Sequence, residues 1–199
     1  MPTEPPERPL LRRDVIVDTA REMIRTEGLH GLSLRRLAGQ LGVTAPALYA
    51  HVADKGDLLR AVAELEFDRL VSRFDAVTTS DPIERLRAYH RAYVEHAREN
   101  PALFDVMFVF APDVGASDLP EGAELPAATQ TFAIALAAVE DAIASGALAP
   151  ADPLLVSLTL WTAAHGVATA LGLGLELPPD YEDLLVNETV DRVLRGWST

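Results

Sequence analysis

The chain lacks cysteine altogether, so among its 199 residues neither a disulfide framework nor a thiolate metal site can form. Runs of Val and Ile with alternating period are scarce, whereas Ala and Leu dominate an apolar fraction of 49%. No apolar stretch of about 18 residues runs without polar interruption, and the first residues are Pro-rich and charged. We therefore expect an all-α protein of the cytoplasm, with neither a secretory signal nor a membrane span.

Positive charge is also scarce, since the formal net charge is −13. The excess of negative charge is unevenly distributed along the chain. Residues 1–60 hold nine Lys or Arg and eight Asp or Glu, whereas residues 61–199 hold eight Lys or Arg and twenty-two Asp or Glu. Binding to nucleic acid depends on the local basic surface, because fields between exposed charges are screened beyond about 10 Å at ordinary ionic strength. A nearly neutral N-terminal part is therefore compatible with DNA binding, despite the acidic remainder.

The stretch SLRRLAGQLGVTAPALYAHVADK, residues 33–55, predicts two short helices. Ser33 is a suitable N-cap for the first helix, whose apolar face repeats at three and four residues and stops at Gly42. Thr44 can cap the second helix, residues 45–51, with Pro46 in its first turn and Ala47 and Leu48 as apolar anchors. Two short helices joined by a Gly-containing turn form a helix-turn-helix, whose second helix lies in the DNA major groove.

The run VTAPALYAHV at residues 43–52, followed by DKGDLL at residues 54–59, resembles the DNA-binding domain of TetR-family transcriptional regulators. In that family a small or polar recognition helix is followed by Leu-Tyr-x-His/Tyr-Phe and by a Lys that opens the next helix. This sequence departs mildly, because Val52 stands where Phe is usual and Gly56-Asp57 follow the Lys where Glu is frequent. The resemblance is strongest over residues 12–60 and implies a DNA-binding repressor with a ligand-binding body.

Four residues are expected to contact DNA phosphates. The resemblance implies this role for Tyr49 and His51, although Tyr49 could instead pack partly in the core. Lys55 opens a helix, where the helix dipole disfavours a cation, so we expect a phosphate between its ammonium group and the helix end. Thr44 is expected to offer its hydroxyl and the adjacent amides to a phosphate, or to serve only as a cap.

Contacts to bases are expected from the start of the second helix. Ala45 and Pro46 are small and apolar, so the base groups open to them are thymine methyls. Ser33, Arg35 and Arg36 are expected to support the contacts, although one of the two arginines could simply be solvated. Arg12 and Arg13 are expected to reach along the backbone or the minor groove.

We divide the chain into a disordered tail (residues 1–11), a DNA-binding head (residues 12–54) and a body for effector binding and dimerisation (residues 55–199). A connector helix, residues 55–75, opens the body. Asp-Pro pairs at 81–82 and 152–153 mark helix starts, and residues 111–122 read as a turn-rich acidic loop. With the head, this gives nine helices, of which those after the connector span residues 82–100, 101–110, 124–145, 153–173 and 181–197.

The run WTAAHG at residues 161–166 resembles the Trp-x-x-x-His-Gly signature of one TetR-family branch. Trp161 and His165 are four residues apart and therefore neighbours on one helix face. They either contact a ligand or form a structural Trp with a hydrogen-bonded core His.

A small apolar effector is expected, because the resemblance brings several large side chains together in the body around a cavity. The predicted ligand-binding residues are Tyr89, Tyr93, Phe104, Met107, Phe108, Phe132, Trp161 and His165. No Lys or Arg lies between Arg98 and Arg192, against fifteen Asp or Glu from Glu99 to Asp191. The effector is therefore expected to be neutral or cationic; if the acidic residues only solvate the surface, neutral is favoured.

A homodimer is expected from two apolar helix faces, since two helices from each subunit can close a four-helix interface about a two-fold axis. Such a dimer would place two heads on a pseudo-palindromic operator in double-stranded DNA. The predicted interface residues are Leu154, Leu158, Thr162, Leu185, Val193 and Leu194.

A catalytic reading finds little support. No Gly-rich phosphate loop follows a strand, and none of the five His residues form an i, i+4 pair of the kind that binds zinc. We therefore expect no enzyme, no cofactor and no metal site. Two alternatives stay open: a TetR-like regulator without a small ligand, and a helical carrier or enzyme that uses His90, His96 or His165.

Overall fold

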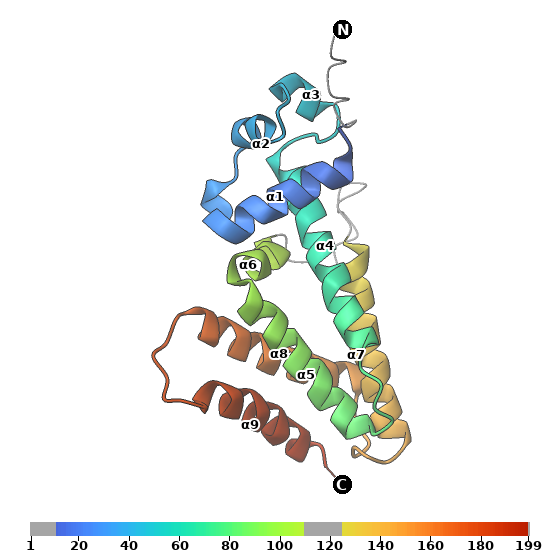
Figure 1. The fold of residues 1–199 in the computed structure, drawn as a ribbon. Helices are drawn as coiled ribbons and strands as arrows, with labels where there is room; N and C mark the ends of the chain where they lie inside the picture. Colours follow the sequence, from blue (N-terminus) through green and yellow to red (C-terminus); the bar gives the residue numbers. More distant parts are fainter. Residues whose placement is uncertain (1–10, 110–124, 199) are drawn as a thin grey trace, which may run out of the picture.

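The computed structural model describes residues 11–109 and 125–198. Within those ranges the chain forms nine α-helices and one short 3-10 helix (Figure 1). Three short helices form a head at one end, and the long helix α4 runs from the head into a bundle of the remaining helices. The predicted all-α fold and helix order are confirmed. Most of the predicted tail and the predicted loop at 111–122 lie outside the described residues.

The head consists of α1 (Arg13–Glu27), η1 (Leu29–Gly31), α2 (Leu34–Gln40) and α3 (Ala45–Tyr49). One face of α1 is buried, with Ile16, Ala20 and Ile24 each 0% exposed. Helix α1 ends at Gly28, whose φ of 74° lies in the region that suits glycine. The 3-10 turn that follows brings the chain back to α2 and closes the head over α1.

Helix α4 (Lys55–Asp75) joins the head to the body. The side chain of Asp54 caps its first turn by accepting a hydrogen bond from the amide of Asp57 at 2.7 Å. Its buried residues include Leu58 in the head and Phe74 near the far end, and both belong to one hydrophobic core that continues from the head into the body. Residues 55–75 therefore form a single continuous helix, with the bounds that the sequence predicted.

The body contains α5 (Pro82–Glu99), α6 (Pro101–Val109) and α7 (Pro126–Ala144). Asp81 caps α5 as predicted, since its carboxylate accepts the amides of Ile83 and Glu84 at 2.9 and 3.0 Å. Helix α6 packs against α1 and α4, so it touches both the head and the body. Helix α7 lies beside α4 along its length (Figure 1).

Helices α8 (Pro153–Gly172) and α9 (Tyr181–Gly196) complete the body. Asp152 caps α8 through the amide of Leu154 at 2.9 Å. The Pro178-Pro179 pair precedes α9 as predicted, but the N-cap is Asp180, with a left-handed φ of 66°. The chain therefore turns sharply at Asp180 before α9 packs against α8 and α5.

Helices α7 and α8 are long and apolar enough to cross a membrane, with mean hydropathies of 1.2 and 1.5. Both nevertheless pack within the bundle, α7 against α4 and α5, and α8 against α5 and α9. Core helices share this composition, so length and hydropathy alone give little support to a membrane span.

Candidate functional site

The helix-turn-helix forms as the sequence predicts. The side chain of Ser33 caps α2 by accepting the amide of Arg36 at 3.3 Å. The turn after α2 uses Gly42 at φ 67°, and the amide of Val43 returns to the carbonyl of Ala38 at 2.9 Å. These bonds fix the angle at which α3 leaves α2. Thr44 occupies the N-cap of α3, but its hydroxyl makes no capping bond in the described structure.

Helix α3 is held by one fully buried side chain, Leu48, at 0% exposure. Ala47 was predicted to be a second anchor and is instead exposed, because on a helix of five residues one face packs and the others point outward. Thr44 and Pro46 are exposed, and Tyr49 is 54% exposed. Of the side chains predicted to meet DNA, Thr44, Pro46 and Tyr49 therefore lie on the open surface of the head, whereas Ala45, His51 and Lys55 are half-buried.

Lys55 has a partner that the sequence did not suggest. Its Nζ donates a hydrogen bond to the carbonyl oxygen of Leu32 at 2.8 Å. This carbonyl explains how a cation is accommodated at the start of α4 without any phosphate. An ammonium group has three donors, so the remaining N–H groups stay available to DNA.

The arginines of the head differ in what they bind. Arg36 bonds to the carbonyl of Gly31 at 2.6 Å and to the carboxylate of Glu27. Arg13 bonds to His51 and Asp57, so its guanidinium is held within the head in the described structure. Arg35 is exposed and makes no side-chain bond to any residue of 11–109 or 125–198. Arg35 is therefore the better placed of the predicted supporting cations.

In the body, Trp161 and His165 are joined through Tyr93 of α5. The Tyr93 hydroxyl lies 3.0 Å from Nδ1 of His165, and Nε1 of Trp161 donates to the same hydroxyl at 3.3 Å. Because an indole N–H can only donate, the tyrosine hydroxyl accepts from Trp161, and the imidazole tautomer sets the direction of its bond with His165. Burial lowers the pKa of His165. These bonds account for the pair as structural residues, although Trp161 keeps 39% of its surface exposed.

Aromatic rings surround this hydrogen-bonded group. Phe104 and Phe108 of α6 lie with ring centroids 5.5 and 4.6 Å from that of His165. Tyr93 meets Phe104 edge to face at 5.6 Å. These contacts make this part of the predicted ligand site a closely packed cluster, in which Tyr93 and Phe104 are buried and Phe108 and His165 are half-buried.

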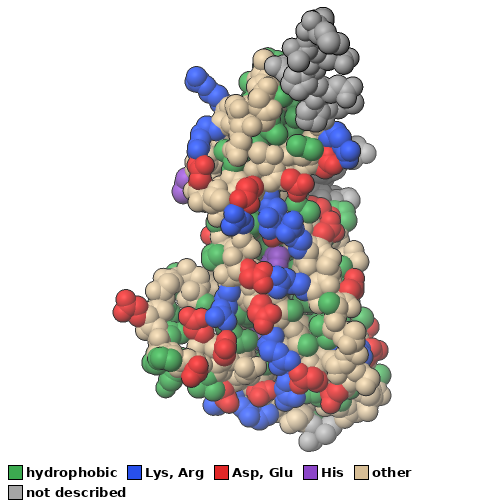
Figure 2. Space-filling model, viewed as in Figure 1, with side chains coloured by type: hydrophobic (Ala, Val, Ile, Leu, Met, Phe, Trp, Pro, Cys, Tyr) green, Lys and Arg blue, Asp and Glu red, His purple; other side chains and the backbone are tan. Residues whose placement is uncertain are grey.

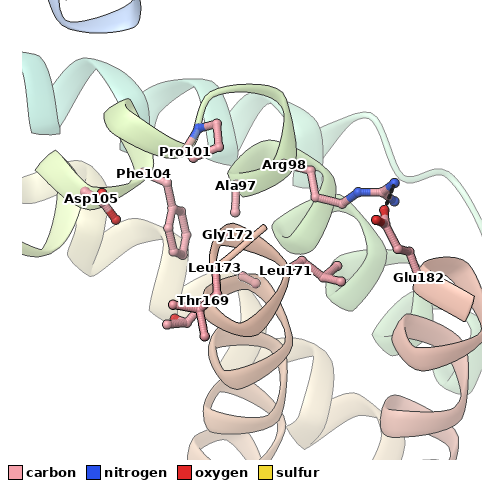
Figure 3. Close-up of a pocket in the computed structure, with 11 residues that line it drawn as sticks. Ala97, Arg98, Pro101, Phe104, Asp105, Thr169, Leu171, Gly172, Leu173 and Glu182 are labelled. Atoms are coloured by element: carbon pink, nitrogen blue, oxygen red, sulfur yellow. Dashed lines mark hydrogen bonds and ion pairs between the residues drawn. The ribbon is translucent and has the colours of Figure 1, made fainter. Parts of the chain in front are cut away.

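A pocket of about 360 Å³ opens beside that core, between the end of α8, the junction of α5 and α6, and the start of α9 (Figure 3). Arg98 reaches across its edge to Glu182 at 2.6 Å, and Asp183 lies 3.1 Å from the same guanidinium. Arg98 also lines a second hollow of about 210 Å³ between α5 and α9. The first pocket is lined by Ala97, Arg98, Pro101, Phe104, Asp105, Ala168, Thr169, Leu171, Gly172, Leu173 and Glu182.

Of the eight predicted ligand-binding residues, only Phe104 lines this pocket. Tyr89 stacks on Phe74 at 4.5 Å, and Met107 is 0% exposed in the core. Phe132 is half-buried on α7 and does not line either hollow in the described part of the body. These three lie outside the two hollows, because large apolar side chains fill cores as readily as they line cavities.

The charge expectation also needs a correction. The stretch without Lys or Arg begins only after Arg98. The fold brings Arg98 of α5 to the edge of the pocket, opposite α8 and α9. A permanent cation is therefore present. It is balanced by Glu182 and Asp183, and Asp105 adds a further carboxylate to the lining.

A row of apolar side chains is exposed on α8 and α9. Leu154, Leu158 and Leu185 are 48%, 37% and 38% exposed. Thr162 is exposed and Val193 is half-buried, whereas Leu194 is only 4% exposed within the subunit, because α9 turns it toward α8 and α5. We therefore remove Leu194 from the predicted interface. Hydrophobic side chains also gather over the start of α9 and the loop before it, at the lower left of Figure 2.

Sequence reasoning missed the buried carboxylate of Glu66. It is 1% exposed, pairs with Arg21 of α1, and lies 3.5 Å from Nε2 of His96 on α5. A signal was available, since Glu66 stands four residues after Val62 and four before Leu70, both of which are fully buried. A charged residue in that register indicates a buried partner.

Comparison with known proteins agrees with this architecture. Residues 16–62 match the family model described as "Bacterial regulatory proteins, tetR family". Residues 86–193, more than half of the chain, match "Tetracyclin repressor-like, C-terminal domain". The chain belongs to the TetR family. It is therefore a DNA-binding transcriptional regulator of a non-enzymatic family, which sets aside the carrier or enzyme alternative.

Relatives in the TetR family match over different lengths. Tetracycline repressor protein class C from Escherichia coli is 48% identical over 54 residues, 27% of this chain and 25% of that protein. Uncharacterized HTH-type transcriptional regulator Rv0681 from Mycobacterium tuberculosis is 28% identical over 160 residues, 78% of this chain and 68% of that protein. The chain thus spans about a quarter of the first relative and about two thirds of the second.

A solved structure of a protein with unknown function from Rhodococcus sp. RHA1 is similar over nearly the whole chain. It has a TM-score of 0.82 and 29% identity, with 98% of this chain and 100% of that chain covered. The likeness extends through head and body together.

Proposed function

We propose that this TetR-family regulator is a cytoplasmic homodimeric repressor that a small effector releases from a pseudo-palindromic operator. The observation that carries the proposal is the pairing of an open helix-turn-helix in the head with an uncovered leucine face on α8 and α9. The repressor named among its relatives supports the direction of regulation.

Dimerisation follows from the exposed leucines. Leu154 and Leu158 are one turn apart on α8, and Leu185 lies on the neighbouring α9. Exposed apolar side chains of this size, contiguous over two packed helices, stabilise an isologous contact when a second copy covers them. Such a contact would link two heads, so that each binds one half-site and the affinities reinforce one another.

In the proposed complex, α3 enters the major groove. Ala45 and Pro46 at its start face the bases, while Thr44, Tyr49, His51 and Lys55 contact the phosphates on either side. Ser33 and Arg35 at the start of α2 lie on the same open surface and support the neighbouring backbone. The exposure of α3 and the unpaired state of Arg35 among the described residues support this placement.

The effector is placed in the pocket between α5, α6 and α8. Its lining combines Phe104 and Leu171 with two carboxylates and one arginine that is already paired. A neutral or cationic apolar molecule fits that balance, since an anion would have to displace Glu182 from Arg98. A TetR-like regulator without a small ligand is the alternative.

The proposal is tested in two steps. Selection of bound fragments from the genome of the source organism identifies the operator, which should be a pseudo-palindrome bound by a dimer. A thermal-shift screen with neutral, cationic and anionic hydrophobic compounds, followed by operator release, tests the effector. Release by an anionic compound alone would overturn the charge argument, and the absence of any hit would favour the alternative without a ligand.

A further inference from the structure

Helix α3 is too short to hold its own position. It spans five residues, Ala45–Tyr49, and isolated helices of that length do not persist in water. Within α3 one residue, Leu48, is fully buried, and the N-cap Thr44 contributes no side-chain bond. The direction in which α3 presents its side chains to DNA therefore depends on how its two ends are tied to the rest of the head.

Arg13, at the first position of α1, holds the C-terminal end of α3 in place by hydrogen bonds. Its Nη1 donates to the carbonyl oxygen of His51 at 2.6 Å. The same guanidinium bonds both oxygens of Asp57 on α4, Nη2 to Oδ1 at 2.6 Å and Nη1 to Oδ2 at 3.0 Å. One planar group thus joins α1, the end of α3 and the first turn of α4, in a fork geometry that a lysine cannot reproduce.

Asp57 closes the same linker from the other side. Its Oδ2 accepts the amide of Ala53 at 2.9 Å, while its own amide is bonded to Asp54 at 2.7 Å. Asp57 and Asp54 therefore accept hydrogen bonds from the Ala53 amide in the linker and from the Asp57 amide in the first turn of α4. The hydrogen bond from Arg13 lowers the pKa of Asp57, which keeps the carboxylate charged.

Arg25, at the other end of α1, shows what an ordinary surface pair looks like here. Arg25 bonds to Glu22 at 2.5 Å, three residues away on the same helix, and the two side chains are 45% and 49% exposed. The Arg13 and Asp57 side chains are 46% and 24% exposed and 44 residues apart in the chain. Arg25–Glu22 joins no two elements, so it provides a matched control for Arg13–Asp57.

We propose that Arg13 and Asp57 are positioning residues for operator binding: they set the orientation of α3 without touching DNA. The proposal rests on DNA binding by the head and requires neither the dimer nor the effector. The proposal predicts the sign of the change in DNA affinity when the charge of Asp57 is removed. Asp57 is acidic and lies on a DNA-binding head, so removing its charge should strengthen DNA binding if electrostatics alone mattered. If Asp57 holds Arg13 in place, removing its charge weakens binding.

The variants Arg13→Lys and Asp57→Asn test this, with Arg25→Lys and Glu22→Gln as controls. The Lys variants keep the net charge, so a loss of affinity cannot come from fewer cations. Operator affinity should fall about tenfold, the factor that corresponds to about 1.4 kcal/mol, for both test variants and stay near the original for both controls. The slope of log affinity against log salt should stay unchanged, because no phosphate contact is lost.

A second measurement needs no DNA. Hydrogen exchange of the amides of Leu48, His51 and Val52, which close α3 onto the carbonyls of Thr44 and Leu48, reports the stability of the helix. Exchange there should speed up in Arg13→Lys and Asp57→Asn, with the exchange of α5 unchanged. This readout stands even if no operator is recovered, which separates the inference from the proposed repressor function.

Three results would overturn the inference. Tighter DNA binding by Asp57→Asn would show that its charge acts only by repulsion. A salt slope that falls by about 0.9 in Arg13→Ala but not in Arg25→Ala would show that Arg13 binds a phosphate directly. Unchanged exchange of the α3 amides in both test variants would show that Leu48 alone positions the helix.

Discussion

Arg21 of the head and Glu66 of the connector helix form an ion pair in which the carboxylate is almost completely shielded from solvent. The side chains are 14% and 1% exposed, and His96 of α5 approaches the same carboxylate at 3.5 Å. Glu66 therefore pairs with the first helix of the DNA-binding head and at the same time lies against α5 of the body. His96 directly precedes Ala97 and Arg98, which line the pocket.

Glu66→Gln should lower the free energy of unfolding by about 3 kcal/mol, since it leaves the buried Arg21 without its counter-charge. Urea denaturation at fixed protomer concentration measures the loss. Glu99→Gln is the control, because Glu99 pairs with Arg73 across the same helices α4 and α5 but is 53% exposed. That variant should lose less than about 1 kcal/mol. Equal losses in the two variants would contradict a special role for the buried pair.

Stability should depend on pH through His90. This residue is 5% exposed, and burial lowers its pKa to about 4 from an ordinary 6.5. The folded state therefore favours the neutral ring, so stability is complete above about pH 6.5 and is lost as the pH falls toward 4. The loss attributable to His90 is about 3 kcal/mol.

Chemical denaturation between pH 7 and pH 4 follows this loss. His90→Leu should flatten the acid dependence, because the ring that must be protonated is gone. The exposed His30 provides the control, and His30→Gln should leave the dependence unchanged. An equally steep loss in His90→Leu would assign the acid sensitivity to other groups.

Leu158→Glu and Leu185→Glu should convert the proposed dimer into a monomer at micromolar concentration. A carboxylate placed in the centre of an apolar contact would be desolvated without a partner in both subunits. Sedimentation velocity measures the change. Val15→Glu is the matched control, since Val15 is 45% exposed on α1, away from α8 and α9. A monomer in the original protein would refute the proposed interface itself.

Lys55→Ala and Tyr49→Phe should weaken binding to all DNA sequences alike, whereas substitutions at Ala45 and Pro46 should change the preferred sequence. Lys55 is the only lysine of the chain, and Leu32 already occupies one of its donors. If the remaining donors bind a phosphate, Lys55→Ala lowers the salt slope by about 0.9 as well as the affinity. Unchanged affinity and slope would show that Lys55 serves only the head.

The sequence by itself determined the elements with local causes. Ser33, Asp54, Asp81 and Asp152 cap helices where the pattern predicted them, because a cap is a bond between residues two or three apart. The glycine at 42 ends α2 for an equally local reason. The helix-turn-helix, the connector helix and the all-α class therefore followed from the sequence.

Only the tertiary structure decided which side chains meet across the chain. Arg13 was predicted to reach DNA and instead bonds Asp57, 44 residues away, and Arg98 enters a pocket whose opposite wall is α8 and α9. Of the aromatic residues predicted to surround a ligand, only Phe104 lines the pocket, which opens beside the ring cluster around His165. Helical periodicity predicts which face of a helix is apolar, but core, cavity and interface all use apolar faces. Their separation depends on how the helices pack, which the spacing along one helix does not contain.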